Sequence, residues 1–243
     1  MNGQALKQEA SRLGIELTRA QLEAFAYFEE ALYQANRVMN LTSVPKEECW
    51  FRHFLDSLLL APLIPKGATV LDVGSGPGLP GVCLAIARAD LVVSCLDSSS
   101  KCCEFLQVNF ASSGRLPFLF EVIEGRAEEV AHVPDYRERY DFVTGRAVAP
   151  LPIQLEISSA FCRVGGLVVP MRTPQDRQIA RGKFDVLGIR LAQLETKELA
   201  PIRAPRLFPV YRKLGKTDAA YPRSWSKIKR SPLGPKEWNE SDG

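Results

Sequence analysis

Four glycines between Asp72 and Gly81 form the part of this sequence whose residue types most directly suggest chemistry. The segment follows an apolar, β-branched run from Ala68 to Val73 and precedes a helical stretch over residues 80–88. At such a strand-to-helix turn, glycines let the backbone turn sharply and let a ligand approach the main chain closely. We therefore expect a nucleotide-like ligand to bind at this turn.

Two overlapping motifs in the segment lead to two different ligands. One is Gly76-x-Gly78-x-x-Gly81, the dinucleotide fingerprint whose helix faces a pyrophosphate. The other, Asp72-x-Gly74-x-Gly76-x-Gly78, resembles the nucleotide loop of class I S-adenosylmethionine methyltransferases. S-adenosyl-L-methionine is net cationic, so the carboxylate of Asp72 suits it, whereas the same charge would repel a pyrophosphate. The charge therefore favours S-adenosyl-L-methionine as the cofactor.

Three further sites follow later predicted strands. Asp97 lies 19 positions after Gly78, where a carboxylate can accept both ribose hydroxyls of an adenosine or can cap the next helix. Ala127-Glu128 is placed to contact an adenine, although an acid also suits a helix start. Arg146 follows the fourth strand, at the edge where ligands bind in open α/β sheets, and a buried salt bridge is its alternative role.

The elements that position these residues alternate regularly from residue 68 onward. Repeated strand-helix-strand units predict an α/β fold with a mostly parallel, Rossmann-like sheet and helices on both faces. Two late strands, near 191–198 and 207–213, have too short a connection for a crossover helix and predict an antiparallel edge. We expect an N-terminal helical extension over 1–66, a methyltransferase domain over 67–215 and a mobile basic tail over 216–243.

The N-terminal extension begins with a strong helix signal. Apolar residues recur at steps of three and four from Leu22 to Met39, and Thr18 with Gln21 forms a capping box before them. A second helix is expected from about Lys46 to Leu60.

Composition excludes several classes of protein. Hydrophobic residues make up 46% and charged residues 24% of the 243 positions, as in an ordinary globular chain. No apolar run approaches the ~18 residues of a membrane span, and the polar start has no apolar region behind it. The six cysteines sit mostly in apolar segments, which predicts free thiols and a cytoplasmic location. Cys49 and His53 have ligand spacing but no second pair, so we expect no metal, and nothing compels more than a monomer.

Positive charge is concentrated near the C-terminus. Residues 201–236 hold ten Lys or Arg against one acid, which predicts a polyanionic partner or, alternatively, a solvated tail. Four of these cations are interleaved with Trp225 and are expected to bind RNA: Arg223, Lys227, Lys229 and Arg230. Removing residues 217–243 should then weaken RNA binding and leave cofactor affinity unchanged.

Five motifs occur in order along the chain: Asn40-Leu41-Thr42, Arg52-His53-x-x-Asp56-Ser57, the string from Asp72 to Gly81, Asp97-Ser98 followed by Lys101, and Arg146-Ala147. Together they resemble the small-subunit ribosomal RNA methyltransferase G family, also called glucose-inhibited division protein B, over about residues 20 to 175. The resemblance implies methylation of N7 of one guanine in bacterial 16S ribosomal RNA, as free RNA or in the small ribosomal subunit.

The resemblance also implies roles for individual residues. Cofactor contacts are implied at Gly74, Leu79, Asp97, Ser98, Ser99, Ala127, Glu128 and Arg146. The RNA side is implied to include Arg52, His53, Asp56, Lys101 and Arg146. The candidate catalytic residues are Arg146, Asp56 and His53, while Cys102-Cys103 departs from the more polar or basic pair expected there.

This chemistry requires no general base, because guanine N7 carries a free lone pair and no proton. Catalysis would rest on holding the reactants ~3 Å apart, and Asp56 or Asp72 could offset charge on the guanine. Asp56 as a surface acid and His53 as a packing histidine remain alternatives. Two other functions also stay open: a methyltransferase for a small molecule or protein, and a nucleoside-binding module without turnover.

Overall fold

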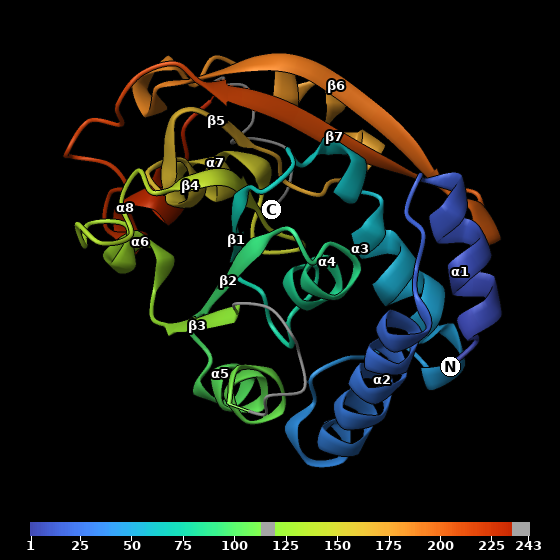
Figure 1. The fold of residues 1–243 in the computed structure, drawn as a ribbon. Helices are drawn as coiled ribbons and strands as arrows, with labels where there is room; N and C mark the ends of the chain where they lie inside the picture. The colour runs from blue at the N-terminus through green and yellow to red at the C-terminus, as the bar shows by residue number, and fades with distance from the viewer. Residues whose placement is uncertain (113–119, 235–243) are drawn as a thin grey trace. The chain divides into compact units, whose positions relative to one another are not determined.

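The computed structural model describes residues 1–112 and 120–234. Its seven strands form a mostly parallel sheet in the order β3-β2-β1-β4-β5-β7-β6 (Figure 1). This confirms the predicted α/β fold. Within the described residues, no helix is long and apolar enough to cross a membrane.

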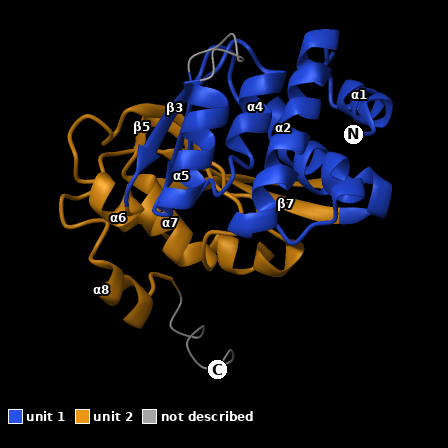
Figure 2. Ribbon diagram, turned by 90° about the horizontal axis from the view of Figure 1, so that it is seen from below, with its two compact units in different colours: residues 1–125, 198–204 blue, residues 126–197, 205–243 orange. Residues whose placement is uncertain are grey.

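The chain divides into two compact units, shown in different colours in Figure 2. Unit 1 comprises residues 1–125 with 198–204, and unit 2 comprises residues 126–197 with 205–243. In unit 1 the helical N-terminus clusters with the first three strands, and the domain boundaries at 66 and 215 stay a prediction.

Unit 1 contains the parallel strands β1 (Thr69–Val73), β2 (Val92–Asp97) and β3 (Phe120–Glu124). In register, Val73 lies opposite Leu96 and Asp97 lies opposite Glu124, so the carboxyl ends of the three strands share one edge. Two helices follow the strands, α4 (Gly81–Ala87) and α5 (Ser100–Leu106). The mostly buried strands β1 and β2 have the nearly continuous apolar sequence expected of parallel strands covered on both faces.

The N-terminal part of unit 1 contains α1 (Gly3–Arg12) and α2 (Arg19–Met39). Thr18 caps α2 through the predicted capping box. The predicted helix over 46–60 is instead a series of short pieces: 3-10 turns at Lys46–Glu48 and Ala61–Leu63, a π-helix at Trp50–Leu55, and α3 at Asp56–Leu58. Phe54 anchors these pieces on α2, with its ring 5.0 and 5.4 Å from the rings of Phe25 and Phe28.

Unit 2 contains the parallel strands β4 (Tyr140–Thr144) and β5 (Cys162–Val168). The long strand β7 (Ala204–Lys213) runs antiparallel to β5, and β6 (Ile189–Leu199) lies beyond it at the sheet edge. The helices of unit 2 are α6 (Ala127–Val130), α7 (Leu151–Ser159) and α8 (Trp225–Arg230).

The C-terminal segment differs from the expected mobile tail over its described part. Arg223 forms an ion pair at 2.6 Å with Glu156 of α7, whose side chain is fully buried. Residues 225–230 form α8, with Ile228 fully buried. The physical reason is that buried Glu156 requires a cation, and this segment supplies one. Residues 235–243 of the predicted tail lie outside the described residues.

Candidate functional site: a glycine loop, an acidic strand end and a short helix

The glycine loop after β1 adopts backbone conformations that favour glycine at three positions. The φ angles of Gly74, Gly76 and Gly78 are 67°, 53° and 97°. A Cβ on Gly78 would lie 2.3 Å from Val82, and one on Gly81 would lie 2.4 Å from the sulfur of Cys95. A Cβ on Gly76 would meet no heavy atom within 4 Å. Thus Gly78 and Gly81 let the loop pack on its own unit, while Gly76 borders open space that a ligand can enter.

Asp72, at the end of β1, is fully buried beneath this loop. Its Oδ2 accepts a hydrogen bond from the backbone N–H of Gly81 at 2.7 Å, which fixes the start of α4. Burial raises the pKa of the neighbouring Cys95 thiol well above its usual value, and the charge of Asp72 adds to that shift. The carboxylate of Asp72 therefore holds the backbone of the loop at Gly81. It also places a negative charge beneath the loop.

Asp97, at the end of β2, ties the glycine loop to the next turn. Its Oδ2 accepts the N–H of Gly76 at 2.7 Å and its Oδ1 accepts the N–H of Ser99 at 2.8 Å. Ser99 is the N-cap residue of α5, so Asp97 and Ser98 do not cap that helix. Asp97 is partly exposed, and a carboxylate has about four acceptor sites, so it retains capacity for hydroxyl donors.

In unit 1 the structure thus brings together the predicted residues of the glycine loop and of the turn that follows β2. The other predicted cofactor residues, Ala127, Glu128 and Arg146, belong to unit 2.

In unit 2, Ala127 and Glu128 form the first turn of α6. Glu128 is 7% exposed, and its Oε1 accepts a hydrogen bond from Nε of Arg126 at 2.9 Å. The guanidinium of Arg126 lies over the ring of Trp225, 4.7 Å from its centroid. The sequence provided no signal for this role of Arg126, because its aromatic partner is about a hundred positions away along the chain.

Arg146 follows β4 and is half-buried, with a parallel bridge to Met171. The loop that carries it is held from α7, since Nε2 of Gln154 donates to the carbonyl of Gly145 at 2.9 Å. One nitrogen of Arg172 donates both to the carbonyl of Ala149 and to Oε1 of Gln154. Sequence reasoning missed Gln154 and Arg172. The one available signal is that Gln154 lies among apolar residues of a predicted helix, where a buried amide needs hydrogen-bond partners.

His53 and Asp56 lie on the π-helix and on α3 of unit 1, and both are buried, at 6% and 4% exposed. Nε2 of His53 is 2.7 Å from the hydroxyl of Thr42, whose backbone is in turn held by Asn36. The contacts of His53 agree with the alternative that it is a packing residue. Asp56 is buried, so it is not the surface acid that was its alternative.

The predicted RNA-side cations have diverse surroundings. Arg52 forms an ion pair with Glu48, and its guanidinium lies 5.6 Å from the ring centroid of Phe51. Lys101 is exposed on α5. On α8, Lys227, Lys229 and Arg230 are exposed, whereas the guanidinium of Arg223 is engaged by Glu156.

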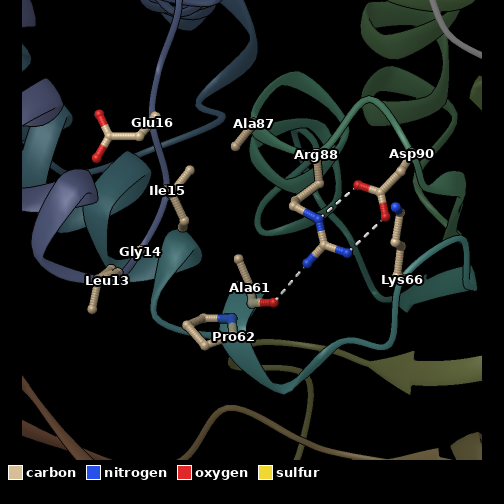
Figure 3. A pocket seen from close by; sticks show the side chains of 10 residues that line it. All are labelled: Leu13, Gly14, Ile15, Glu16, Ala61, Pro62, Lys66, Ala87, Arg88 and Asp90. Carbon is tan, nitrogen blue, oxygen red and sulfur yellow. Dashed lines mark hydrogen bonds and ion pairs between the residues drawn. The ribbon is translucent and has the colours of Figure 1, made fainter.

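A separate pocket of about 440 Å³ lies in unit 1, near the amino end of β1 and therefore away from the glycine loop (Figure 3). Arg88 crosses it and binds both carboxylate oxygens of Asp90, at 2.7 and 2.8 Å, and the carbonyl of Ala61 (Figure 3). The hydrogen bonds from Arg88 hold the pKa of Asp90 well below its usual range. Arg88 and Asp90 therefore satisfy each other's charge within this pocket.

Comparison with known proteins identifies the family. The model of the family described as rRNA small subunit methyltransferase G matches residues 21–200. The chain belongs to this family. The protein named ribosomal RNA small subunit methyltransferase G of Caldanaerobacter subterraneus subsp. tengcongensis is 36% identical, over 94% of this chain and 97% of its own length. The protein of that name from Acetivibrio thermocellus is 34% identical, over 94% and 95%.

Solved structures agree on the fold of this methyltransferase G family member. An O-methyltransferase from Bacillus cereus in complex with SAH has a TM-score of 0.54 and 18% identity, and the match covers 86% of this chain and 97% of that one. M. jannaschii TYW2 in complex with AdoMet has a TM-score of 0.52 and 16% identity, over 67% and 76%. Both likenesses concern the fold alone, and they place the chain among class I methyltransferase folds.

The residues present fit S-adenosyl-L-methionine on this structure's own geometry. Open space at Gly76 admits a ligand against the loop backbone. The carboxylate of Asp97 beside it suits the hydroxyls of a ribose, and the buried charge of Asp72 suits a cationic ligand.

Proposed function

We propose that this chain transfers the methyl group of S-adenosyl-L-methionine to N7 of a guanine in the 16S ribosomal RNA of the small subunit. The observation that carries the proposal is the family match over residues 21–200, which includes the glycine loop tied to Asp97 through the N–H of Gly76. The ribosomal RNA substrate follows from the family, and the cofactor follows from the family and the loop together.

Roles for the cofactor residues follow from their chemistry. Asp97 accepts the ribose hydroxyls while it holds the N–H groups of Gly76 and Ser99. Gly74, Gly78, Leu79 and Ser98 form the surrounding backbone, and Asp72 supplies the fixed negative charge below it. Ala127 and Glu128 contact the adenine, and Arg146 borders the reacting groups.

When bound, S-adenosyl-L-methionine would supply a methyl group on a sulfonium: N7 would gain the methyl through its lone pair, the S–CH3 bond would break, and S-adenosylhomocysteine would be left, with no proton to remove from N7. The protein's contribution is therefore positioning and charge. Gln154 and Arg172 fix the loop that carries Arg146, which limits its conformations. Buried Asp56 is the carboxylate that we assign to offset positive charge on the guanine, and His53 holds the neighbouring turn through Thr42.

RNA is bound in this account by exposed cations: Arg52, Lys101, Lys227, Lys229 and Arg230. Arg223 acts differently from the sequence-based expectation, because its guanidinium is committed to Glu156. The protein acts as a monomer in the cytoplasm, where small ribosomal subunits are located, and uses no metal.

Methyl incorporation tests the proposal. Unmodified small subunits, free 16S RNA and a metabolite pool are each incubated with the protein and methyl-labelled cofactor, and labelled RNA is digested to nucleosides. We expect label in 7-methylguanosine from the subunit or the free RNA. Label confined to the metabolite pool or to protein would favour the other methyltransferase function. Cofactor binding without label anywhere would favour a nucleoside-binding module.

A further inference from the structure

Residues 217–231, which we call the C-terminal strap, contact the rest of unit 2 through their backbone carbonyls. Arg137 donates to the carbonyls of Thr217, Tyr221 and Asp218, at 2.8, 3.1 and 3.1 Å. The same guanidinium donates to the carbonyl of Ala131 at 3.0 Å, directly after α6. One side chain thus connects the strap to the C-terminal end of α6.

A second contact binds the strap at the same end of α6. Nε2 of His132 lies 2.8 Å from the carbonyl of Pro222. His132 follows Ala131, the C-cap residue of α6, so the strap holds one position after the helix directly and the position before it through Arg137.

The opposite end of α6 is held by the side chain of Trp225. Arg126 is the N-cap residue of α6, and its guanidinium stacks on the Trp225 ring while its Nε binds Glu128. Figure 1 shows α8, which begins at Trp225, close to α6. A cation held over an indole face gains an attraction that fixes its position. Trp225 therefore limits where Arg126, and through it Glu128, can lie.

Arg223 sets the register of the strap, so that Trp225 reaches Arg126. Its Nε and one terminal nitrogen bind the two carboxylate oxygens of Glu156 at 2.8 and 2.6 Å, and its backbone N–H binds the same carboxylate at 3.0 Å. Bidentate pairs of this kind fix geometry as well as energy. With Glu156 fully buried, the strap has one defined position along α7.

The helix that these contacts hold is too short to be stable alone. The helix α6 has four residues, and its N-cap makes no side-chain capping hydrogen bond. Nucleating a single helical turn is unfavourable without tertiary contacts. The strap supplies such contacts at both ends of this turn.

We propose that the C-terminal strap positions the adenine-binding turn of the cofactor site, with Trp225 as the positioning residue that acts through Arg126. The inference rests on the proposed function, because it takes Ala127-Glu128 as the adenine contact. It reverses the expectation that removing residues 217–243 leaves cofactor affinity unchanged. The strap thus contributes to cofactor binding in addition to carrying the exposed cations of α8.

Calorimetric titration of the full-length protein with S-adenosylhomocysteine tests this inference. Trp225→Ala should raise the dissociation constant about tenfold, the scale of a partly buried cation–π contact, and Trp225→Tyr should restore most of the affinity because it keeps a π face. Ser226→Ala, at an exposed position of the same helix, is the matched control and should bind like the wild type. Trp225→Leu keeps the apolar volume and should behave like Trp225→Ala, which preserves the test if the alanine variant does not fold.

Hydrogen exchange of the ligand-free variants separates positioning from general destabilisation. In Trp225→Ala or Trp225→Leu, the amides of residues 127–131 should exchange faster while those of β1 and β2 stay unchanged. Wild-type affinity in both variants, or reduced affinity with unchanged exchange at 127–131, would overturn the inference. If the wild type itself binds no S-adenosylhomocysteine, the proposed function fails instead, a result that the wild-type titration alone reports.

Discussion

The two parts of the proposed cofactor site are stabilised in different ways. In unit 1, the glycine loop is held by carboxylates close to it in sequence, with Asp72 bonded to Gly81 nine positions away and Asp97 to Gly76 21 positions away. In unit 2, the α6 turn is held from a distance, since His132 and Arg137 bind strap carbonyls 90 and 80 positions away. The loop is therefore determined by its own sequence, whereas the α6 turn depends on where the end of the chain docks.

The largest expected effect would come from a substitution in the glycine loop of unit 1. Gly76→Val should abolish binding of S-adenosyl-L-methionine, because a β-branched residue resists the φ of 53° and its side chain would enter the space above the loop. Gly67→Val is the matched control, since Gly67 has a φ of 69° and also has no atom within 4 Å of a Cβ. Titration should show wild-type affinity for the control, and equal losses in both variants would attribute the effect to strain alone.

The next largest effect concerns Arg223, which fixes the C-terminal strap in unit 2. Arg223→Ala should lower the free energy of unfolding by about 3 kcal/mol, since it leaves Glu156 charged and buried; the partial exposure of Arg223 argues for the lower end of the usual range. Urea denaturation measures this. Adding Glu156→Gln should recover part of the loss by removing the unpaired charge. A single variant as stable as the wild type would contradict the anchoring role of the ion pair.

A smaller effect is expected for the carboxylate that closes the loop. Asp97→Ala should weaken S-adenosyl-L-methionine binding by roughly 1.5–3 kcal/mol, the worth of hydrogen bonds to a charged acceptor. Asp90→Ala offers a comparison in the same unit, since Asp90 also holds a glycine N–H, that of Gly67, but lies at the other end of β1. Calorimetry should find the loss only for Asp97, and wild-type affinity there would remove its ribose role.

The smallest effect concerns the exposed face of α8. Replacing Lys227, Lys229 and Arg230 with glutamine should leave cofactor affinity unchanged, because none of them holds α6. The dependence of RNA affinity on salt should flatten by about 0.7–0.9 log units for each phosphate that the protein no longer neutralises. Filter binding at several potassium chloride concentrations measures the slope, and Lys7→Gln, which removes a single exposed cation from α1, shows the effect of losing one charge elsewhere on the surface. A slope equal to that of the wild type would assign RNA binding to other cations.

The sequence predicted what depends on neighbouring residues. The strand before the glycine loop, the capping box at Thr18 and the acidic end of β2 are confirmed, because apolar runs, caps and turn residues act locally. The two late strands predicted at one edge of the sheet lie there as neighbours, β7 and β6, and the structure adds that β7 runs antiparallel to β5.

The sequence did not predict what depends on tertiary partners. Arg223 was assigned to RNA from its charge, since nothing in a cluster of cations reveals that one of them faces a buried acid such as Glu156. The brace formed by Gln154 and Arg172 escaped prediction for the same reason. The short turns over residues 46–63 replaced a predicted helix because apolar periodicity alone does not distinguish α, π and 3-10 windings.

The most direct test of the central claim is hydrogen exchange of the wild-type protein with and without S-adenosylhomocysteine. We expect slower exchange on ligand binding in three segments at once: the glycine loop at 74–79, the turn at 97–99 and the α6 turn at 126–131. Protection confined to unit 1, or absent from the glycine loop, would contradict a cofactor site built from a self-contained loop and a strap-held helix.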